Sequence, residues 1–188
     1  MRVFVLSTGR CGSTTFERAC RHITNFTAGH ETNKRRVGER RFDYPDQHIE
    51  SDNRLSWFLG GLQTRFDHGQ TFYVHLTRDP RRVAASYAGR WDSGFHSGII
   101  RAFAQGIVMR KQYQEKQRIR LARFYVSTVN ENIAAFLAEK PHRLDFPLER
   151  AEELFPTFWR QIGAEGDLDA ALREFKIRHN ASPSANPT

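Results

Sequence analysis

The segment from Val3 to Phe16 constrains this chain most, because an apolar run ends there in a turn of small and hydroxyl-bearing residues. It reads V-F-V-L-S-T-G-R-C-G-S-T-T-F, and an amphipathic segment follows at once. This order predicts a strand, an anion-binding loop and a helix. Backbone N–H groups at such a turn converge on an anion, and the helix N-terminus adds partial positive charge. We therefore expect the loop to hold a phosphate group.

The loop departs from the Walker A motif, G-x-x-x-x-G-K-[ST], because it has no lysine. No lysine lies between Arg2 and Lys34, and Arg10 stands ahead of Gly12 instead. The missing lysine argues against an ATPase or a kinase. A P-loop nucleotide kinase with an atypical loop is one alternative, and it predicts ATP binding and a Mg²⁺ requirement.

Length and hydropathy limit the class of protein. The 188 residues are enough for one domain with a sizeable core, 1–188, with a loose tail from about residue 182. Mean hydropathy is -0.64, and the apolar runs fall far below the ~20 residues that a membrane span needs, so we expect no membrane partner. Met1 leads almost directly into the first predicted strand, which leaves no room for a signal peptide. The simplest expectation is a cytoplasmic protein.

The chain is strongly basic, and its charge balance leaves two interpretations open. The formal net charge is +8 and the sequence pI is about 10.0. A polyanionic partner and a solvated basic surface explain this balance equally well. A non-catalytic module that binds a nucleotide or nucleic acid is a second alternative. Because no recognisable nucleic-acid motif is present, we do not favour nucleic acid as the partner.

Apolar periodicity predicts strands that alternate with helices. The predicted strands are 3–6, 25–28, 71–77 and 143–146. The predicted helices are 13–21, 51–66, one from Pro80 onward, 99–139 (single or divided near Gly106), 149–162 and 168–175, and the polar segment 33–47 reads as a mobile loop. Alternation of this kind predicts an α/β sandwich around a parallel sheet, in which ligands bind at the carboxyl ends of strands.

Three further features accompany the loop. Arg78 directly follows the strand 71–77, and Asp79-Pro80 then opens a helix with a good N-cap. Ser86 comes eight residues after Arg78. Glu31 lies in the segment G-H-E-T after the strand candidate 25–28, which we expect beside the first strand.

These residues resemble the sulfotransferases that use 3′-phosphoadenosine 5′-phosphosulfate (PAPS). The family binds the 5′-phosphosulfate with a segment [KR]-S-G-T-T, similar to R-C-G-S-T at 10–14. It binds the 3′-phosphate with a strand-end arginine and a serine eight residues later. The resemblance implies a P-loop-type parallel sheet flanked by helices in a three-layer sandwich. It also implies a set of donor-binding residues: Arg10, Cys11, Gly12, Ser13, Thr14, Thr15, Arg78 and Ser86.

Within that family the chain looks most like the tyrosylprotein sulfotransferases, which carry R-S-G-T-T followed by G-E-E-T. Their second glutamate is the catalytic base and stands as far from the loop arginine as Glu31 does from Arg10. The resemblance therefore implies that Glu31 is the base, with His30 and Asp52 as rivals. The family also has a tyrosine-bearing strand that helps to hold adenine. The best counterpart here is the segment 142–146, which has no tyrosine.

Physical chemistry supports the same roles. Sulfuryl transfer is an in-line displacement whose cost is mainly charge placement, as in phosphoryl transfer. Arg10 would stabilise the leaving oxygen, and a carboxylate at Glu31 would take the acceptor's proton. We expect PAPS as donor, 3′,5′-adenosine bisphosphate as product, a hydroxyl-bearing acceptor and a bacterial source. We expect no metal, because the histidines and cysteines show no ligand spacing.

Overall fold

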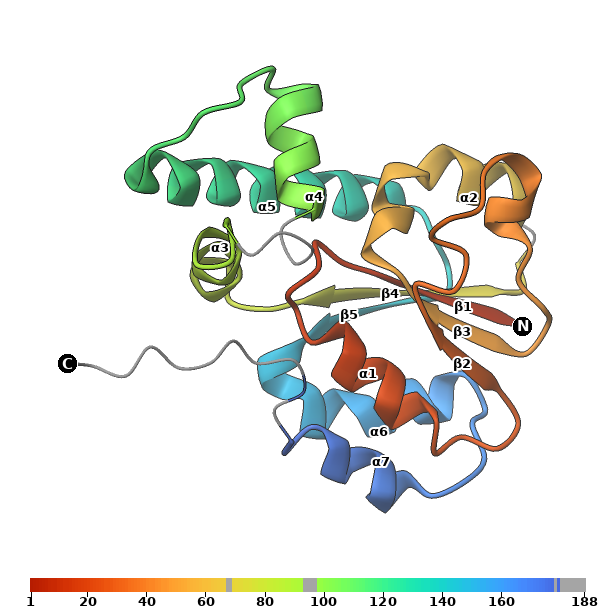
Figure 1. Cartoon of the computed structure of the whole chain (residues 1–188). Coiled ribbons are helices and arrows are strands. Elements are labelled where there is room, and N and C mark those ends of the chain that lie inside the picture. Colours follow the sequence, from red (N-terminus) through yellow and green to blue (C-terminus); the bar gives the residue numbers. More distant parts are fainter. Residues whose placement is uncertain (67–68, 93–97, 178, 180–188) are drawn as a thin grey trace.

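The core of the protein is a parallel five-stranded sheet, seen edge-on in the computed structural model of Figure 1. The structure describes residues 1–66, 69–92, 98–177 and 179. The strands follow the order β2-β3-β1-β4-β5, and every neighbouring pair is parallel. Their bounds are Arg2–Leu6 (β1), Thr27–His30 (β2), His48–Ser51 (β3), Thr71–Thr77 (β4) and Arg143–Pro147 (β5).

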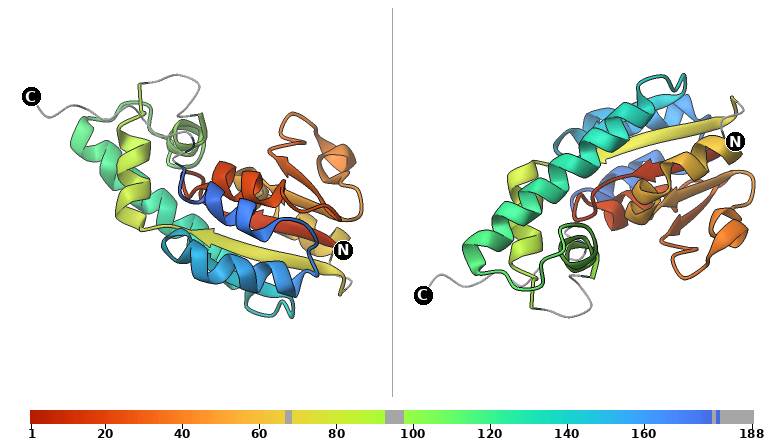
Figure 2. Two further views of the ribbon diagram at one scale, coloured as in Figure 1. Left: turned by 90° about the horizontal axis from the view of Figure 1, so that it is seen from below. Right: turned by 90° about the horizontal axis from the view of Figure 1, so that it is seen from above.

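Helices cover both faces of the sheet and make a three-layer sandwich, which confirms the predicted fold class. Viewed from below in Figure 2, the helices in front are α1 (Ser13–Cys20), α6 (Ala151–Gln161) and α7 (Leu168–Glu174). Viewed from above, the helices in front include α2 (Leu59–Phe66) and α5 (Glu115–Leu137). Beyond the carboxyl ends of the strands, α3 (Pro80–Ala88) packs against α5. The next helix in the chain after α3 is α4 (Gly98–Ala102).

The central strand β1 is apolar because both of its faces are covered. Its residues from Val3 to Leu6 are fully buried. β3 pairs with one side of β1 and β4 with the other, so that Val5 lies opposite both Ser51 and Val74. Phe16 of α1 packs edge-on against Phe146 of β5. Continuous apolar runs are typical of such doubly covered parallel strands.

The position predicted for the second strand is wrong, because β3 lies between β1 and β2. The sequence of β3 is H-I-E-S, which carries no apolar signature, yet all four residues are buried. Glu50 explains this: its Oε1 accepts from the N–H of Thr32 at 2.8 Å, and its Oε2 lies 3.0 Å from His48 Nε2. Polar side chains with such partners can be buried, so hydropathy alone does not reveal the strand.

Two predicted segments are also corrected. The range 33–47, predicted as a loop, contains a 3₁₀ turn at Gly38–Phe42 and buries Arg41 and Tyr44, and its mobility stays a prediction. The predicted helix 51–66 is instead the end of β3, a 3₁₀ turn at Asn53–Trp57, and α2. Asp52 caps that turn by accepting from the N–H of Arg54.

The range 99–139 forms two separate helices, which was one of the two predicted alternatives. α4 continues into a π-helical turn at Phe103–Ile107, and α5 begins only at Glu115. The predicted tail from 182 lies outside the described residues. Within the described ranges, no helix combines the length and apolar character that crossing a bilayer requires.

Candidate functional site

The loop between β1 and α1 turns through left-handed backbone conformations. Gly9, Arg10 and Gly12 have φ angles of 77°, 61° and 87°. A Cβ on Gly9 would lie 2.6 Å from Tyr87 Oη, and one on Gly12 would lie 2.8 Å from a methyl carbon of Leu148. Both positions therefore require glycine. Gly12 is the N-cap residue of α1, so the first-turn N–H groups of this helix face the loop opening.

Side chains from three other elements fix the base of this loop. The carbonyl of Thr8 accepts from the hydroxyl of Tyr87 on α3 at 2.6 Å and from that of Tyr125 on α5 at 2.9 Å. The carbonyl of Ser7 accepts from Ser56 Oγ at 3.0 Å. With its carbonyls held from behind, the loop is organised before any ligand arrives.

The side chain of Cys11 lies inside this loop. Its side chain is buried, and Sγ donates to the carbonyl of Gly9 at 3.2 Å. Burial raises the pKa of the Cys11 thiol to about 11, so the thiol is protonated at neutral pH. The side chain therefore packs inside the turn, away from the opening.

A pocket of about 1160 Å³ opens at the carboxyl ends of β1 and β4. Except for Cys11, every residue predicted to bind the donor lines it: Arg10, Gly12, Ser13, Thr14, Thr15, Arg78 and Ser86. Arg10 Nε donates to Ser86 Oγ at 3.1 Å, although the two residues are 76 positions apart. The loop motif and the strand-end motif thus form one wall.

Positive charge is concentrated on this wall. Burial lowers the pKa of Arg10, and the nearby charges of Arg90 and Arg78 lower it further. Arg82 also lines the pocket. Cations held this close favour a bound anion, which would offset their mutual repulsion.

Sequence reasoning missed the roles of Arg82 and Arg90, although a signal was present. Arg82, Ser86 and Arg90 recur every fourth residue along α3 and its C-terminal end, so they share one side of the helix. Once Ser86 is placed at the pocket, this spacing predicts both arginines near it.

Residues 148–153 and the end of the chain line the rest of the pocket, and Arg150 and His179 add basic groups to this second wall. Leu148, Phe175 and Ile177 supply apolar surface, and Glu149 and Glu152 are among the carboxylates beside them. β5 ends directly before Leu148. This strand, the counterpart of the tyrosine-bearing strand of the PAPS-dependent enzymes, therefore leads into the pocket. The sequence carried no signal for this wall, because Phe175 and Ile177 come from the far end of the chain.

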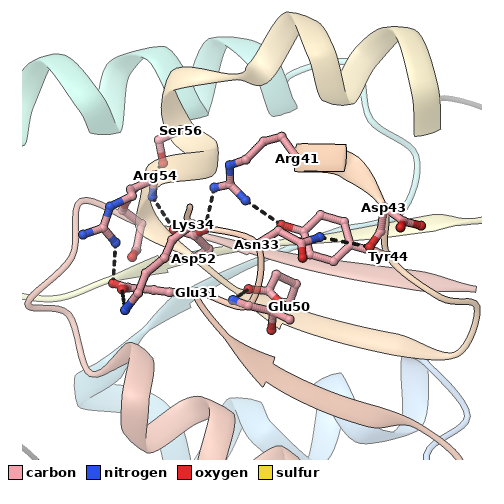
Figure 3. Close-up of polar contacts among 12 residues, drawn as sticks. Glu31, Asn33, Lys34, Arg41, Asp43, Tyr44, Glu50, Asp52, Arg54 and Ser56 are labelled. Atoms are coloured by element: carbon pink, nitrogen blue, oxygen red, sulfur yellow. Dashed lines mark hydrogen bonds and ion pairs between the residues drawn. The ribbon is translucent and has the colours of Figure 1, made fainter. Parts of the chain in front are cut away.

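Glu31 directly follows β2 (Figure 3). It is not among the residues that line this pocket. Its carboxylate bonds Arg54 Nη1 at 2.8 Å and Lys34 Nζ at 3.1 Å. Burial alone would raise the pKa of Glu31, but Arg54 and Lys34 outweigh it and hold the pKa below its ordinary value. The carboxylate is therefore ionised at neutral pH. The ion pair with Arg54 is a contact that the sequence analysis missed.

The two rival bases occupy different settings. His30 Nε2 lies 3.1 Å from Ser13 Oγ, so it reaches the anion-binding loop directly. Asp52 is fully buried, pairs with Arg41 Nη2 at 2.5 Å and accepts from the N–H of Arg54. These partners give Asp52 a structural task. Among the described residues, no group of three potential metal-ligating side chains gathers at one place.

Comparison with known proteins supplies one structural relative. No family model and no curated protein matches this chain. The structure is similar to the sulfotransferase domain from the curacin biosynthetic pathway, with a TM-score of 0.64. The match covers 97% of this chain and 80% of that domain at 12% sequence identity. At this identity the likeness establishes the architecture, so the chain has the fold of a sulfotransferase domain.

Proposed function

We propose that this protein is a sulfotransferase that moves a sulfuryl group from PAPS to a hydroxyl of an acceptor molecule. The hydrogen bond between Arg10 and Ser86 is the observation that carries the proposal. It joins the two motifs through which the chain resembles PAPS-dependent enzymes, in a pocket large enough for a nucleotide. The sulfotransferase fold supports the same assignment.

The pocket suggests how the donor lies. The 5′-phosphosulfate fits the loop opening, where Arg10 and the N-terminus of α1 supply positive charge. The 3′-phosphate fits Arg78 and Ser86, a permanently charged planar donor and a hydroxyl. The apolar surface of Leu148 and Phe175 is then left for the adenine ring.

The reaction follows from this arrangement. The acceptor oxygen forms a bond to sulfur while sulfur's bond to the bridging oxygen breaks, and the electron pair of that bond stays on the departing bisphosphate. Arg10 lies where that negative charge develops. One well-placed donor of this kind contributes roughly 2.7–4 kcal/mol to transition-state stabilisation.

The acceptor's proton goes to a carboxylate in this account, and Glu31 is our candidate. It is ionised, and Arg54 and Lys34 fix its orientation. Glu31→Gln keeps the side chain's shape and removes its basicity, so turnover should fall about 10²–10⁴-fold while bisphosphate affinity stays nearly constant. If Glu31→Gln remains active and His30→Ala does not, the proton goes to His30 instead.

Calorimetry with 3′,5′-adenosine bisphosphate tests the donor site. Arg78→Ala should weaken binding by about 1.5–3 kcal/mol, which is about 10- to 150-fold, because a charge-assisted hydrogen bond is lost. Adenosine 5′-monophosphate has no 3′-phosphate, so its affinity should barely change. Arg81→Ala is the matched control, since Arg81 lies three residues further along, in the first turn of α3, and outside the lining of this pocket. Equal losses for the two nucleotides would contradict the assignment of the 3′-phosphate.

A further inference from the structure

The turn between α4 and α5 exposes three consecutive aliphatic side chains. Ile107, Val108 and Met109 are 61%, 37% and 80% exposed. Figure 1 shows this connection arching away from the sheet, and the N-terminal end of α5 lies at the edge of the molecule in both views of Figure 2. We call residues 107–111 the apolar tip, because Arg110 and Lys111 complete it. An exposed aliphatic run of this kind is typical of an interaction site.

The backbone holds the tip in this outward position. The N–H of Val108 donates to the carbonyl of Phe103 at 3.0 Å, and the N–H of Arg110 donates to that of Ala104 at 2.9 Å. Phe103 and Ala104 are both buried, so the wide turn is anchored to the core. Met109 has a φ of 60°, a conformation that disfavours residues other than glycine. The aliphatic side chains are therefore presented by a defined turn.

The segments on either side of the tip are strongly basic. Between residues 98 and 127 the only acid is Glu115, whereas the cations are Arg101, Arg110, Lys111, Lys116, Arg118, Arg120 and Arg123. Arg118 pairs with Asp92, and the other cations are exposed. Lys116, Arg120 and Arg123 follow one another at helical spacing along α5. This charge favours an anionic surface as the partner of the tip.

The shape and chemistry of the tip distinguish among anionic partners. Single-stranded nucleic acid is usually bound by aromatic side chains on which bases stack, and the tip carries none. A folded protein would need a pocket shaped to receive a projecting tip. A bilayer needs no preformed pocket, because aliphatic side chains enter its interface while neighbouring lysines and arginines meet anionic headgroups.

We propose that the apolar tip docks this protein on the surface of an anionic lipid bilayer. Ile107, Val108 and Met109 enter the headgroup region, and Lys111 and Lys116 contact lipid phosphates. Such a contact stays at the bilayer surface and needs no membrane-spanning helix. It therefore revises the expectation of no membrane partner, which rested on mean hydropathy and the length of apolar runs. It is independent of the proposed sulfuryl transfer.

Vesicle co-sedimentation of the full chain tests this proposal. The protein should bind vesicles that contain phosphatidylglycerol and should not bind pure phosphatidylcholine vesicles. The double variant Ile107→Ser/Met109→Ser keeps the charge and should bind about tenfold more weakly or worse, because the inserted apolar surface is lost. Val37→Ser is the matched control, since Val37 is 85% exposed and lies elsewhere. Lys111→Glu/Lys116→Glu should weaken binding, and so should high salt.

Three results with vesicles would overturn the proposal. The first is no binding to anionic vesicles, and the second is equal binding to neutral ones. The third is unchanged binding by the Ile107→Ser/Met109→Ser variant, which would show that the contact is purely electrostatic. Thermal unfolding of that variant should match the wild type, because both substituted side chains are exposed. A duplex oligonucleotide that competes equally with vesicles would assign the surface to nucleic acid instead.

Discussion

The substitution Arg41→Met tests how the segment carrying Glu31 is held in place. Arg41 Nη2 lies 2.5 Å from Asp52 Oδ2, and the two side chains are only 4% and 0% exposed (Figure 3). Arg41 Nη1 also donates to Tyr44 Oη at 2.8 Å. Methionine fills much of the same space but leaves Asp52 as an uncompensated buried charge. Removing one partner of a buried ion pair costs roughly 3–5 kcal/mol, a large share of the ~5–15 kcal/mol by which domains are stable.

Urea unfolding measures this loss and a double-mutant cycle assigns it. Asp52→Asn removes the charge and keeps an oxygen that can accept from the N–H of Arg54. The double variant should be more stable than the sum of the single losses predicts, by about 0.5–3 kcal/mol, because no charge is then left unpaired. Arg40→Met, at an exposed neighbouring position, is the control and should stay within about 0.5 kcal/mol of the wild type. A loss under about 1 kcal/mol in Arg41→Met would refute the reasoning.

Three further predictions concern the loop and the candidate base. In steady-state kinetics, Arg10→Ala should lower turnover about 10²–10³-fold and weaken bisphosphate binding less, whereas Arg10→Lys should keep part of the activity. Gly9→Ala should lower both the free energy of unfolding and the affinity for bisphosphate, because the new Cβ would meet Tyr87. Gly38 has a similar positive φ but lies in open space, so Gly38→Ala should lose only the energy of the unfavourable backbone conformation, about 1 kcal/mol. Burial raises the pKa of Glu31, but neighbouring cations outweigh it and hold this pKa below the ordinary 4.5. As pH falls, Glu31 is therefore protonated in the unfolded chain before it is protonated in the folded protein, so the folded protein loses stability below about pH 4.5. Urea unfolding at about pH 7 and pH 3 measures this loss. It should be smaller in Glu31→Gln than in the wild type.

The parts of the fold that the sequence predicted are those whose signal is local. β1 reads as a buried strand because covered parallel strands are continuously apolar. The start of α3 was predicted from Asp79-Pro80, and Asp79 Oδ1 does accept from the N–H of Arg81 at 2.8 Å. The two motifs were predicted at one edge of the sheet because they follow parallel strands, and both line one pocket.

The parts that the sequence did not predict depend on partners far along the chain. β3 is polar, and its burial depends on partners such as Thr32 and the neighbouring strands. Arg54 meets Glu31 only because β3 separates β1 from β2 and carries the next turn to the same edge. Phe175 and Ile177 reach the pocket through the packing of α7 on α1, which no local pattern encodes.

The measurement that tests the central claim most directly is the fate of the donor. Purified protein is incubated with PAPS labelled with ³⁵S and with a panel of phenol, tyrosine-peptide and sugar acceptors. Our account predicts that bisphosphate appears, that label moves to an acceptor in equal amount, and that Arg10→Ala slows both. An intact donor, together with phosphoryl transfer from ATP and Mg²⁺ by the same preparation, would contradict the account and establish a kinase.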